Sequence, residues 1–260
     1  EITASHAAEN TFLPLALKKI GLMEYESALE LQRTFHQEIA DSTRPNTLIL
    51  LEHPPVFTAG RRTLDSEMPT DGSRVITVDR GGKITFHGPG QVVAYPLVDL
   101  KRAGYFVKEL VYRIEEAVIK TLLQFGLTGH RVAGAAGVYL RLDEPSGHAR
   151  LPQRPQKGSE NDGQHAPDFV GLGKVAALGI KVSRHCTYHG VALNVAMDLE
   201  PYSRINPCGY AGLEVTQMLE LNPAVGLDQV EPVLVAQLSQ QLGLSPVWID
   251  ALPSAFLSEM

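Results

Sequence analysis

The order of extended and helical segments is the sequence feature that most constrains this fold. Short apolar runs typical of strands occur at residues 47–51, 74–79, 92–98, 132–142, 174–182 and 187–195. Apolar residues at steps of three and four predict helices over residues 24–40 and 105–125, and further helices are expected near 212–219 and over 229–242. Strands and helices do not alternate strictly. We therefore expect an α+β fold with a mixed or antiparallel sheet flanked by helices, rather than a doubly wound parallel sheet.

Length and composition fit one large domain. With 260 residues and 44% hydrophobic content, the chain can bury a substantial core. Residues 143–168 differ from the rest, because they are rich in Pro, Gln, Ser, Gly, Asn and His and hold almost no large apolar side chains. Such a segment cannot bury a core. We predict a single domain over residues 1–260 with a polar, disordered insertion at about 143–168.

Charge and hydropathy argue against two classes of function. The formal net charge of −6 is unlike the basic surface of most nucleic-acid-binding domains. No apolar run approaches the roughly 18 residues needed to cross a bilayer. We therefore expect a soluble protein that binds neither nucleic acid nor membrane. Two cysteines, Cys186 and Cys208, are too few for a disulfide framework and leave open a reducing compartment, a catalytic thiol or core cysteines.

The densest group of residues capable of chemistry runs from Arg80 to Gln91. Its glycines permit positive φ values and let backbone N–H groups approach a ligand closely. Its arginine, threonine and histidine can donate hydrogen bonds. A tight glycine-rich hairpin would have a similar glycine content, but the number of polar anchors favours a substrate-binding loop.

Cys208 and Lys174 are candidates for covalent chemistry. Cys208 lies between Pro207 and Gly209, in a turn that can present its sulfur. An isolated cysteine is more often a small core residue, and a nucleophile needs a neighbour that favours the thiolate. Lys174 begins an otherwise apolar strand and could be that neighbour, although a lysine at a strand end is normally solvated. The two residues are far apart in the chain, so the sequence alone does not show whether they lie close together in the fold.

A zinc site is an alternative reading of residues 185–189. His185, Cys186 and His189 are close in sequence, and Cys208 could add a further ligand. In an extended segment, however, Cys186 would face away from both histidines. We therefore expect no metal, with Cys186 structural and His189 lining a pocket.

Five blocks, in order, resemble the lipoyl(octanoyl)transferase family. The segment from Arg80 to Tyr95 matches a family signature: Arg-Gly-Gly, two free positions, Thr, an aromatic residue and His, followed by Gln and Tyr at fixed offsets. The other four blocks are Glu52–Gly60, Lys174–Ile180, Tyr188–Asn194 and Asn206–Gly209. The resemblance runs from about Tyr25 to Leu219. Only the polar insertion lacks a counterpart in the shorter bacterial members.

The resemblance implies a fold like the catalytic domain of biotin and lipoate protein ligases. It implies transfer of an octanoyl or lipoyl group from acyl-carrier protein, through a thioester on Cys208, to a lysine of a lipoyl domain. Lys174 would be the catalytic partner of Cys208, and no cofactor would be required. The residues expected to bind substrate are Arg80, Gly81, Gly82, Lys83, Ile84, Thr85, Phe86, His87, Ala177, Leu178, Gly179, His189, Gly190, Val191 and Ala192.

The same resemblance implies macromolecular partners. The donor would be octanoyl-acyl-carrier protein, and the acceptors would be lipoyl domains of 2-oxoacid dehydrogenase complexes and the glycine cleavage H protein. Both kinds of partner tend to be acidic, so a local basic patch is expected. Its candidates are Lys18, Lys19, Arg61, Arg62, Lys83 and Arg102. The insertion and the start without methionine suggest a mitochondrial protein, with the bacterial cytoplasm as the alternative.

Two other functions remain open on sequence alone. An ATP-dependent lipoate or biotin ligase would account for the glycine-rich loop and Lys174, but it would leave Cys208 without a role. A non-catalytic acyl- or carrier-binding module would contain an inert, buried Cys208.

Overall fold

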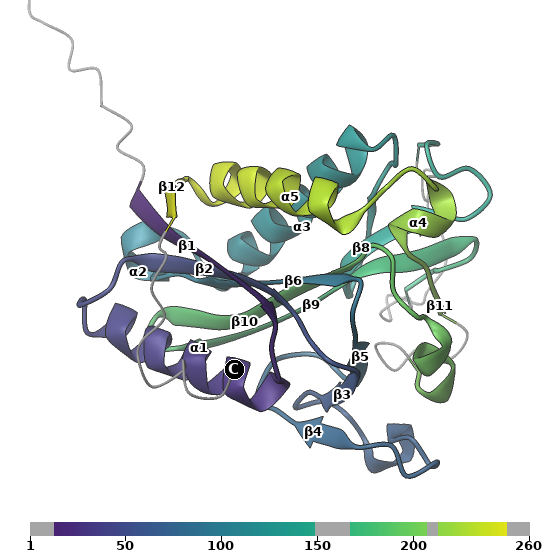
Figure 1. Cartoon of the computed structure of the whole chain (residues 1–260), viewed down its shortest axis with the longest axis horizontal. Coiled ribbons are helices and arrows are strands. Elements are labelled where there is room, and N and C mark those ends of the chain that lie inside the picture. Colours follow the sequence, from purple (N-terminus) through teal and green to yellow (C-terminus); the bar gives the residue numbers. More distant parts are fainter. Residues whose placement is uncertain (1–12, 149–166, 207–212, 249–260) are drawn as a thin grey trace, which may run out of the picture.

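The computed structural model describes residues 13–148, 167–206 and 213–248. Its centre is a mixed sheet with the strand order β12-β1-β2-β6-β10-β9-β8-β7, and β11 pairs with β9 off this path (Figure 1). The strands are β1 (Leu13–Leu22), β2 (Asn46–Glu52), β6 (Gln91–Leu97), β7 (His130–Val132), β8 (Ala135–Arg141), β9 (Leu172–Ser183), β10 (Cys186–Asn194), β11 (Glu214–Val215) and β12 (Leu244–Trp248).

Strand directions confirm the predicted mixed sheet. β1 is parallel to β2 and β12, and β11 is parallel to β9. The remaining neighbours, from β2 through β6, β10, β9 and β8 to β7, are antiparallel. A second, small sheet has the order β4-β3-β5, with β3 (Val56–Ala59), β4 (Val75–Thr77) and β5 (Thr85–His87).

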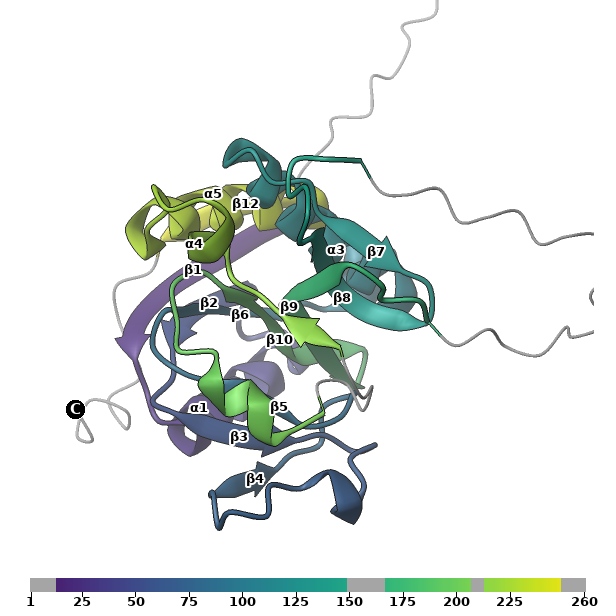
Figure 2. The same cartoon turned by 90° about the vertical axis from the view of Figure 1, so that its right-hand side faces the viewer.

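Helices cover both faces of the large sheet. α1 (Tyr25–Ala40) and the small sheet lie on one face, whereas α3 (Val107–Gln124) and α5 (Leu227–Leu242) lie on the other (Figures 1 and 2). Shorter elements are α2 (Leu100–Ala103), α4 (Met218–Leu221), and the 3₁₀ helices η1 (Asp65–Glu67) and η2 (Glu200–Arg204). None of the described helices is long and apolar enough to span a membrane.

The apolar run of β2 follows from this layering. Leu48 and Leu50 belong to the core beneath α3 and α5, and Ile49 and Leu51 belong to the core beneath α1. A strand buried on both faces needs apolar residues at successive positions rather than alternating ones.

A tight hairpin joins β9 to β10. Ser183 pairs with Cys186, and the two residues between them, Arg184 and His185, have φ angles of 48° and 63°. A two-residue turn with both central residues at positive φ matches the twist of an antiparallel pair. The resulting register places Ala177–Gly179 opposite Gly190–Ala192, so two segments predicted to bind substrate are neighbours across the sheet.

Some element predictions were wrong. The helix expected near residues 212–219 is β11 followed by α4, because Glu214 and Val215 pair with β9. The strand expected at 132–142 is divided between β7 and β8. β1 and β12 were not predicted. Most of the polar insertion, residues 149–166, lies outside the described residues, so its disorder stays a prediction.

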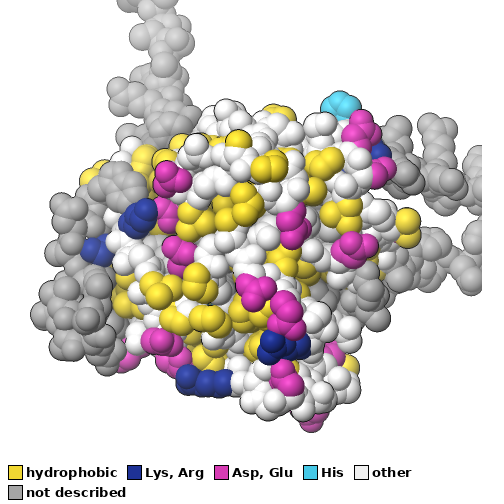
Figure 3. Space-filling model, turned by 45° about the vertical axis from the view of Figure 1, so that its right-hand side comes forward, with side chains coloured by type: hydrophobic (Ala, Val, Ile, Leu, Met, Phe, Trp, Pro, Cys, Tyr) yellow, Lys and Arg dark blue, Asp and Glu magenta, His cyan; other side chains and the backbone are white. Residues whose placement is uncertain are grey.

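Acidic and apolar side chains are spread over the face shown in Figure 3, whereas Lys and Arg gather at only a few places on it. This uneven distribution agrees with the net charge of −6 and limits where an acidic partner could dock.

Candidate active site

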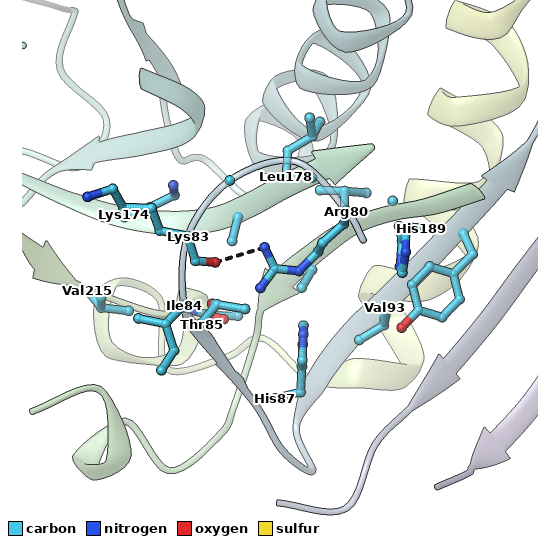
Figure 4. Close-up of a pocket in the computed structure, with 18 of the residues that line it drawn as sticks. Arg80, Lys83, Ile84, Thr85, His87, Val93, Lys174, Leu178, His189 and Val215 are labelled. Atoms are coloured by element: carbon cyan, nitrogen blue, oxygen red, sulfur yellow. Dashed lines mark hydrogen bonds between the residues drawn. The ribbon is translucent and has the colours of Figure 1, made fainter. Parts of the chain in front are cut away.

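A pocket opens between the small sheet and the β9–β10 hairpin (Figure 4). The predicted site residues that line it are Arg80, Gly82, Lys83, Ile84, Thr85, His87, Lys174, Ala177, Leu178, Gly179, His189, Gly190, Val191 and Ala192. Lys174 and His189 lie at opposite ends in the close-up, with Leu178 and Ile84 on facing walls between them. The pocket thus has the Lys174 ammonium at one end and mainly apolar walls, which Arg80, Lys83 and His87 interrupt.

Two predicted binding residues do not line the pocket. The N–H of Gly81 donates to the Ile180 carbonyl at 3.2 Å. This bond ties the predicted substrate-binding loop, residues 80–91 (the pocket loop), to β9. The ring of Phe86 points into a separate apolar cluster and packs against Phe57 at 5.1 Å between ring centroids. Both residues support the loop.

The pocket also includes residues that were not predicted as site residues, namely Tyr25, Val93, Tyr95, Asn194, Tyr202 and Val215. Tyr95 and Asn194 end two of the family blocks, and this signal could have identified them. Tyr202 and Val215 had no comparable sequence signal.

Arg80 holds the loop together from within. The side chain is 8% exposed, and its guanidinium donates to the carbonyl oxygens of Gly81 at 3.0 Å and Lys83 at 2.8 Å. It also donates to the carbonyl and hydroxyl oxygens of Thr58 on β3, at 2.8 and 2.9 Å. The planar fork of an arginine suits such simultaneous bonds. These contacts give Arg80 a structural part in shaping the pocket.

Gly179 lets this loop lie directly on β9. A Cβ atom at Gly179 would be 2.7 Å from the Gly81 carbonyl oxygen and 3.2 Å from Cδ of Arg80. Any larger residue would therefore push the loop away from the strand.

Lys174 is buried at the end of the pocket, with 4% exposure. Its Nζ donates to the Ala136 carbonyl at 3.1 Å and lies 5.5 Å from the ring centroid of Tyr139. Its own carbonyl accepts from the N–H of Thr216 at 3.0 Å, next to β11. Lys174 is therefore held from β8 on one side and from the β11 segment on the other.

Buried histidines near the pocket are neutral. Burial lowers the pKa of His53 to about 4 and that of His87 to about 3. His53 bonds the Met23 carbonyl at 2.7 Å and the Tyr95 hydroxyl at 2.6 Å, while His87 bonds Gln91 at 2.7 Å. Burial also raises the pKa of Tyr25 to about 12. His53, His87 and Tyr25 thus contribute hydrogen bonds without charge at neutral pH.

His189 is oriented by Asp79. Its Nε2 lies 3.0 Å from the Asp79 carboxylate, which also accepts from the Tyr188 hydroxyl. Burial lowers the pKa of His189 to about 4, although Asp79 opposes this shift. Because a carboxylate only accepts hydrogen bonds, Nε2 carries the proton in the neutral ring and Nδ1 is an acceptor.

A buried amide network joins the loop to both sides of residues 207–212. Gln91 donates to Asn194 at 2.9 Å and to the Tyr202 hydroxyl at 3.2 Å. Asn194 donates to the Thr216 carbonyl at 3.0 Å. Tyr202 precedes the segment 207–212 and Val215 follows it, and both line the pocket. Cys208 itself lies outside the described residues.

Cys186 is a poor nucleophile. It is buried in the core beneath α1, and burial together with Asp99 raises the pKa of its thiol to about 11. His185 lies in the exposed β9–β10 turn, and His189 bonds Asp79. Among the described residues, no group of three or more His, Cys, Asp or Glu side chains could hold a metal ion. Cys208, the further ligand in the zinc interpretation, lies outside that set.

Residues 24–239 match the family model described as the lipoyl protein ligase A/B catalytic domain. The chain belongs to this family. Within it, an octanoyltransferase from Albidiferax ferrireducens is 54% identical, with 88% of this chain and 98% of the relative aligned. Octanoyltransferases from Verminephrobacter eiseniae and Variovorax paradoxus are 52% and 53% identical, over 87% and 86% of this chain and 97% and 94% of their own lengths. The family recognised from the five sequence blocks is confirmed.

Solved structures of lipoate protein ligases share this fold. A bipartite lipoate protein ligase from Thermoplasma acidophilum superposes with a TM-score of 0.65 at 14% identity, covering 95% of this chain and 90% of that one. An ATP-bound lipoate-protein ligase A gives a TM-score of 0.64 at 14% identity, covering 95% and 92%. At this identity the likeness shows the fold alone, and it confirms the predicted lipoate-ligase architecture.

Proposed function

We propose that this chain is an octanoyltransferase, which moves an octanoyl or lipoyl group from acyl-carrier protein to a lysine of a lipoyl domain. Octanoyltransferases that are 51–54% identical over nearly their whole lengths support this activity. The observation that best supports it is the pocket itself, because its lining combines buried Lys174 with Tyr202 and Val215, which precede and follow the Cys208 segment in the chain.

The proposed first step is a thioester exchange. The Cys208 thiolate attacks the donor's thioester carbonyl, a new C–S bond forms, and the bond to the carrier's sulfur breaks. Lys174 stabilises the Cys208 thiolate beforehand and passes a proton to the departing carrier thiolate. Because one thioester replaces another, the step is nearly isoenergetic and loading needs no ATP.

The second step forms the amide. The amine of the acceptor lysine attacks the acyl carbonyl, and Cys208 leaves as a thiolate. Lys174, which gave up a proton in the first step, takes the proton that the attacking amine must lose. An amide is more stable than a thioester, so this step commits the reaction.

The pocket walls suit a medium-length acyl chain. Ile84, Val93, Leu178 and Val191 are apolar lining residues of the pocket that holds Lys174 and His189. Burial of each methylene contributes about 0.8 kcal/mol, so a closed apolar slot can discriminate by chain length. We place the acyl carbonyl at the Lys174 end and the chain terminus toward His189.

The docking surface for carrier and lipoyl domains is best sought beside the pocket loop. Of the basic candidates, Lys18 is buried, Lys19 pairs with Glu231, Lys83 with Glu67 and Arg102 with Asp99. Arg61 and Arg62 are exposed and form no ion pair within the described part of the chain. Their N–H groups donate to the carbonyls of Arg80 and Gly82, which places them next to the pocket.

We therefore propose that Arg61 and Arg62 form the docking site for an acidic partner. We infer that octanoyl-acyl-carrier protein is the donor, and that lipoyl domains of 2-oxoacid dehydrogenase complexes and the glycine cleavage H protein are the acceptors. Since the same two arginines border the pocket, donor and acceptor would dock there in turn.

The relatives support a bacterial location. The octanoyltransferases compared above are bacterial proteins, and they lend no support to the mitochondrial expectation. We therefore propose the bacterial cytoplasm.

Intact-protein mass spectrometry tests the covalent route. Wild type and Cys208→Ala are mixed with octanoyl-carrier protein without ATP, and a lipoyl domain is then added. We expect an octanoyl adduct in wild type alone, which the lipoyl domain discharges. An adduct that persists in the variant would mean that the nucleophile is misassigned. Acylation of the lipoyl domain only when ATP is present would favour a ligase, and acyl binding without any transfer would favour a non-catalytic module.

A further inference from the structure

The position of Lys174 depends on the backbone of β8. Its Nζ donates to the Ala136 carbonyl at 3.1 Å, and its ammonium lies over the ring of Tyr139. Both contacts come from one strand. Whatever fixes β8 at Ala136 therefore also helps to fix the ammonium.

β8 is irregular at this point. Gly137 has a φ of +128°, and the pairing with β9 shifts register between Val138 and Tyr139. A Cβ atom on Gly137 would lie 2.7 Å from Cε and 3.0 Å from Nζ of Lys174. The backbone at Gly137 thus forms a wall of the lysine site. The ladder is disrupted at this point, so an anchor outside the sheet can hold the strand in one conformation.

That anchor is a carboxylate on the neighbouring helix. Glu115 of α3 is 7% exposed, and its Oε1 accepts from the N–H of Gly137 at 2.9 Å. Its Oε2 accepts from Nε of Arg131 at 3.0 Å. α3 lies beside β7 and β8 (Figure 2). A buried carboxylate is costly unless it is paired and hydrogen-bonded, and both conditions are met here.

The carbonyl of Ala136 and the N–H of Gly137 belong to the same peptide group. A trans peptide is planar, and its C=O and N–H point in opposite directions. Glu115 holds the N–H from one side, so the C=O is aimed at Lys174 on the other. A hydrogen bond from the N–H to a carboxylate also polarises the carbonyl and strengthens it as an acceptor.

We propose that Glu115 is a positioning residue for Lys174, acting through the Ala136–Gly137 peptide. Its part in the reaction rests on the proposed function, in which Lys174 serves Cys208. Glu115 does not line the pocket, so its effect on the reaction is transmitted through β8.

The chain offers a matched control in the adjacent residue. Glu116 also lies on α3 and bonds Arg131, at 2.9 Å, but it makes no bond to Gly137. The variants Glu115→Ala, Glu115→Asp and Glu116→Ala, each made in the full chain, separate the Gly137 contact from the shared ion pair. Glu115→Asp keeps the charge but moves the carboxylate away from Gly137 by one methylene group. This variant is used for the test if Glu115→Ala does not fold.

Chemical labelling reads the position of Lys174 directly. An amine-reactive reagent is applied, and the rate of Lys174 modification is followed by peptide mass spectrometry. We expect modification several-fold faster in the Glu115 variants than in wild type and Glu116→Ala, because displacement of β8 exposes the ammonium. An unchanged rate in a folded Glu115 variant would overturn the proposal, whatever the enzyme's activity.

The pH profile of octanoyl loading shows how displacement of Lys174 affects the reaction. A free thiol ionises near pH 8.5, so loss of the positioned ammonium should shift half-maximal loading to higher pH. We expect loading at pH 7 to fall by roughly ten- to hundredfold in the Glu115 variants and to recover much of that loss near pH 9. Tyr139 faces the ammonium from β8. Burial keeps Tyr25, His87 and His189 neutral across this range, with pKa values of about 12, 3 and 4.

The two readouts separate failure of the inference from failure of the proposed function. A profile lowered by one factor at every pH would show that Glu115 supports stability only, and it would overturn the positioning role. If wild type forms no Cys208 adduct, the proposed function fails. The labelling rates then still decide whether Glu115 places Lys174.

Discussion

At the scale of single residues, burial determines the charge of the pocket's polar groups. His53, His87 and His189 are held neutral because the protein around them solvates an imidazolium poorly, and burial lowers their pKa values to about 4, 3 and 4. A histidine in an unfolded chain titrates near about 6.5. Between these values the unfolded chain binds more protons than the folded one, so the free energy of unfolding falls as the pH falls.

We therefore expect stability to decrease between about pH 6.5 and pH 4, by roughly 1–3 kcal/mol for each histidine. Urea unfolding midpoints measured across this range test the prediction. His53→Gln should flatten the dependence, whereas His185→Gln, in the exposed turn, should leave its slope as in wild type. A midpoint that stays constant down to pH 4.5 would contradict the explanation.

A second residue-scale prediction concerns Gly179. Gly179→Ala places a methyl group 2.7 Å from the Gly81 carbonyl, so the pocket loop must move. We expect kcat/KM for octanoyl transfer to fall roughly ten- to hundredfold, as for other small displacements of reacting groups. Gly81→Ala is a control on the loop side of the same interface, because a Cβ there would lie at an ordinary 3.4 Å from the Ile180 carbonyl oxygen. A loss in Gly81→Ala as large as in Gly179→Ala would argue against the steric explanation.

At the scale of secondary-structure elements, the turn that starts β6 links three parts of the fold. Gly90 has a φ of +87°, and its N–H donates to the Glu52 carboxylate of β2 at 2.7 Å. Its carbonyl accepts from the N–H groups of Val195 and Ala196, which follow β10. The turn thus joins the ends of β2, β6 and β10 next to the Gln91 network that supports the pocket.

Gly90→Ala should lower the free energy of unfolding by much more than the cost of holding an alanine at positive φ. A Cβ atom there would lie 2.0 Å from the Ala196 carbonyl oxygen. Gly104→Ala is a matched control, because Gly104 has a φ of +76° and nothing within 4 Å of the added atom. We expect about 1–2 kcal/mol of lost stability for the control and a larger loss for Gly90→Ala, measured by urea unfolding. Equal losses would mean that the backbone angle alone is responsible.

At the scale of the whole molecule, the net charge of −6 makes the exposed basic side chains that form no ion pair within the described residues important. An acidic domain approaching this protein is repelled on average and attracted only near exposed cations such as Arg61 and Arg62. Electrostatic attraction of this kind changes association rates and is weakened by salt.

The double variant Arg61→Glu/Arg62→Glu should raise KM for octanoyl-carrier protein and for lipoyl domains, with little change in kcat. It should also remove most of the dependence of KM on salt. Lys108→Glu/Lys120→Glu makes the same change in net charge on α3, which covers the opposite face of the sheet from the small sheet. Steady-state kinetics at two salt concentrations compare the pairs, and equal effects would point to net charge rather than to a local docking surface.

Local patterns in the sequence were sufficient for much of the architecture. The helix predicted over 24–40 is α1, Tyr25–Ala40, and that predicted over 105–125 is α3, Val107–Gln124. Both carry an apolar stripe at helical spacing, which depends only on residues close in sequence. The family blocks likewise placed most of the pocket-lining residues, because each block is a contiguous segment.

Contacts between distant residues decided the rest. β1 is a strand because β2 and β12 pair with it, and Glu214–Val215 is extended because β9 pairs with it. Arg80 supports the pocket loop through its hydrogen bonds to Thr58, which is distant in sequence. Glu115 supports β8 through its hydrogen bond with Gly137, which is also distant in sequence. The sequence alone therefore determined the family, the fold class and most of the segments that form the pocket. Only the tertiary structure decided which side chains face the pocket and which hold it in shape, because non-local packing and hydrogen bonding set those directions.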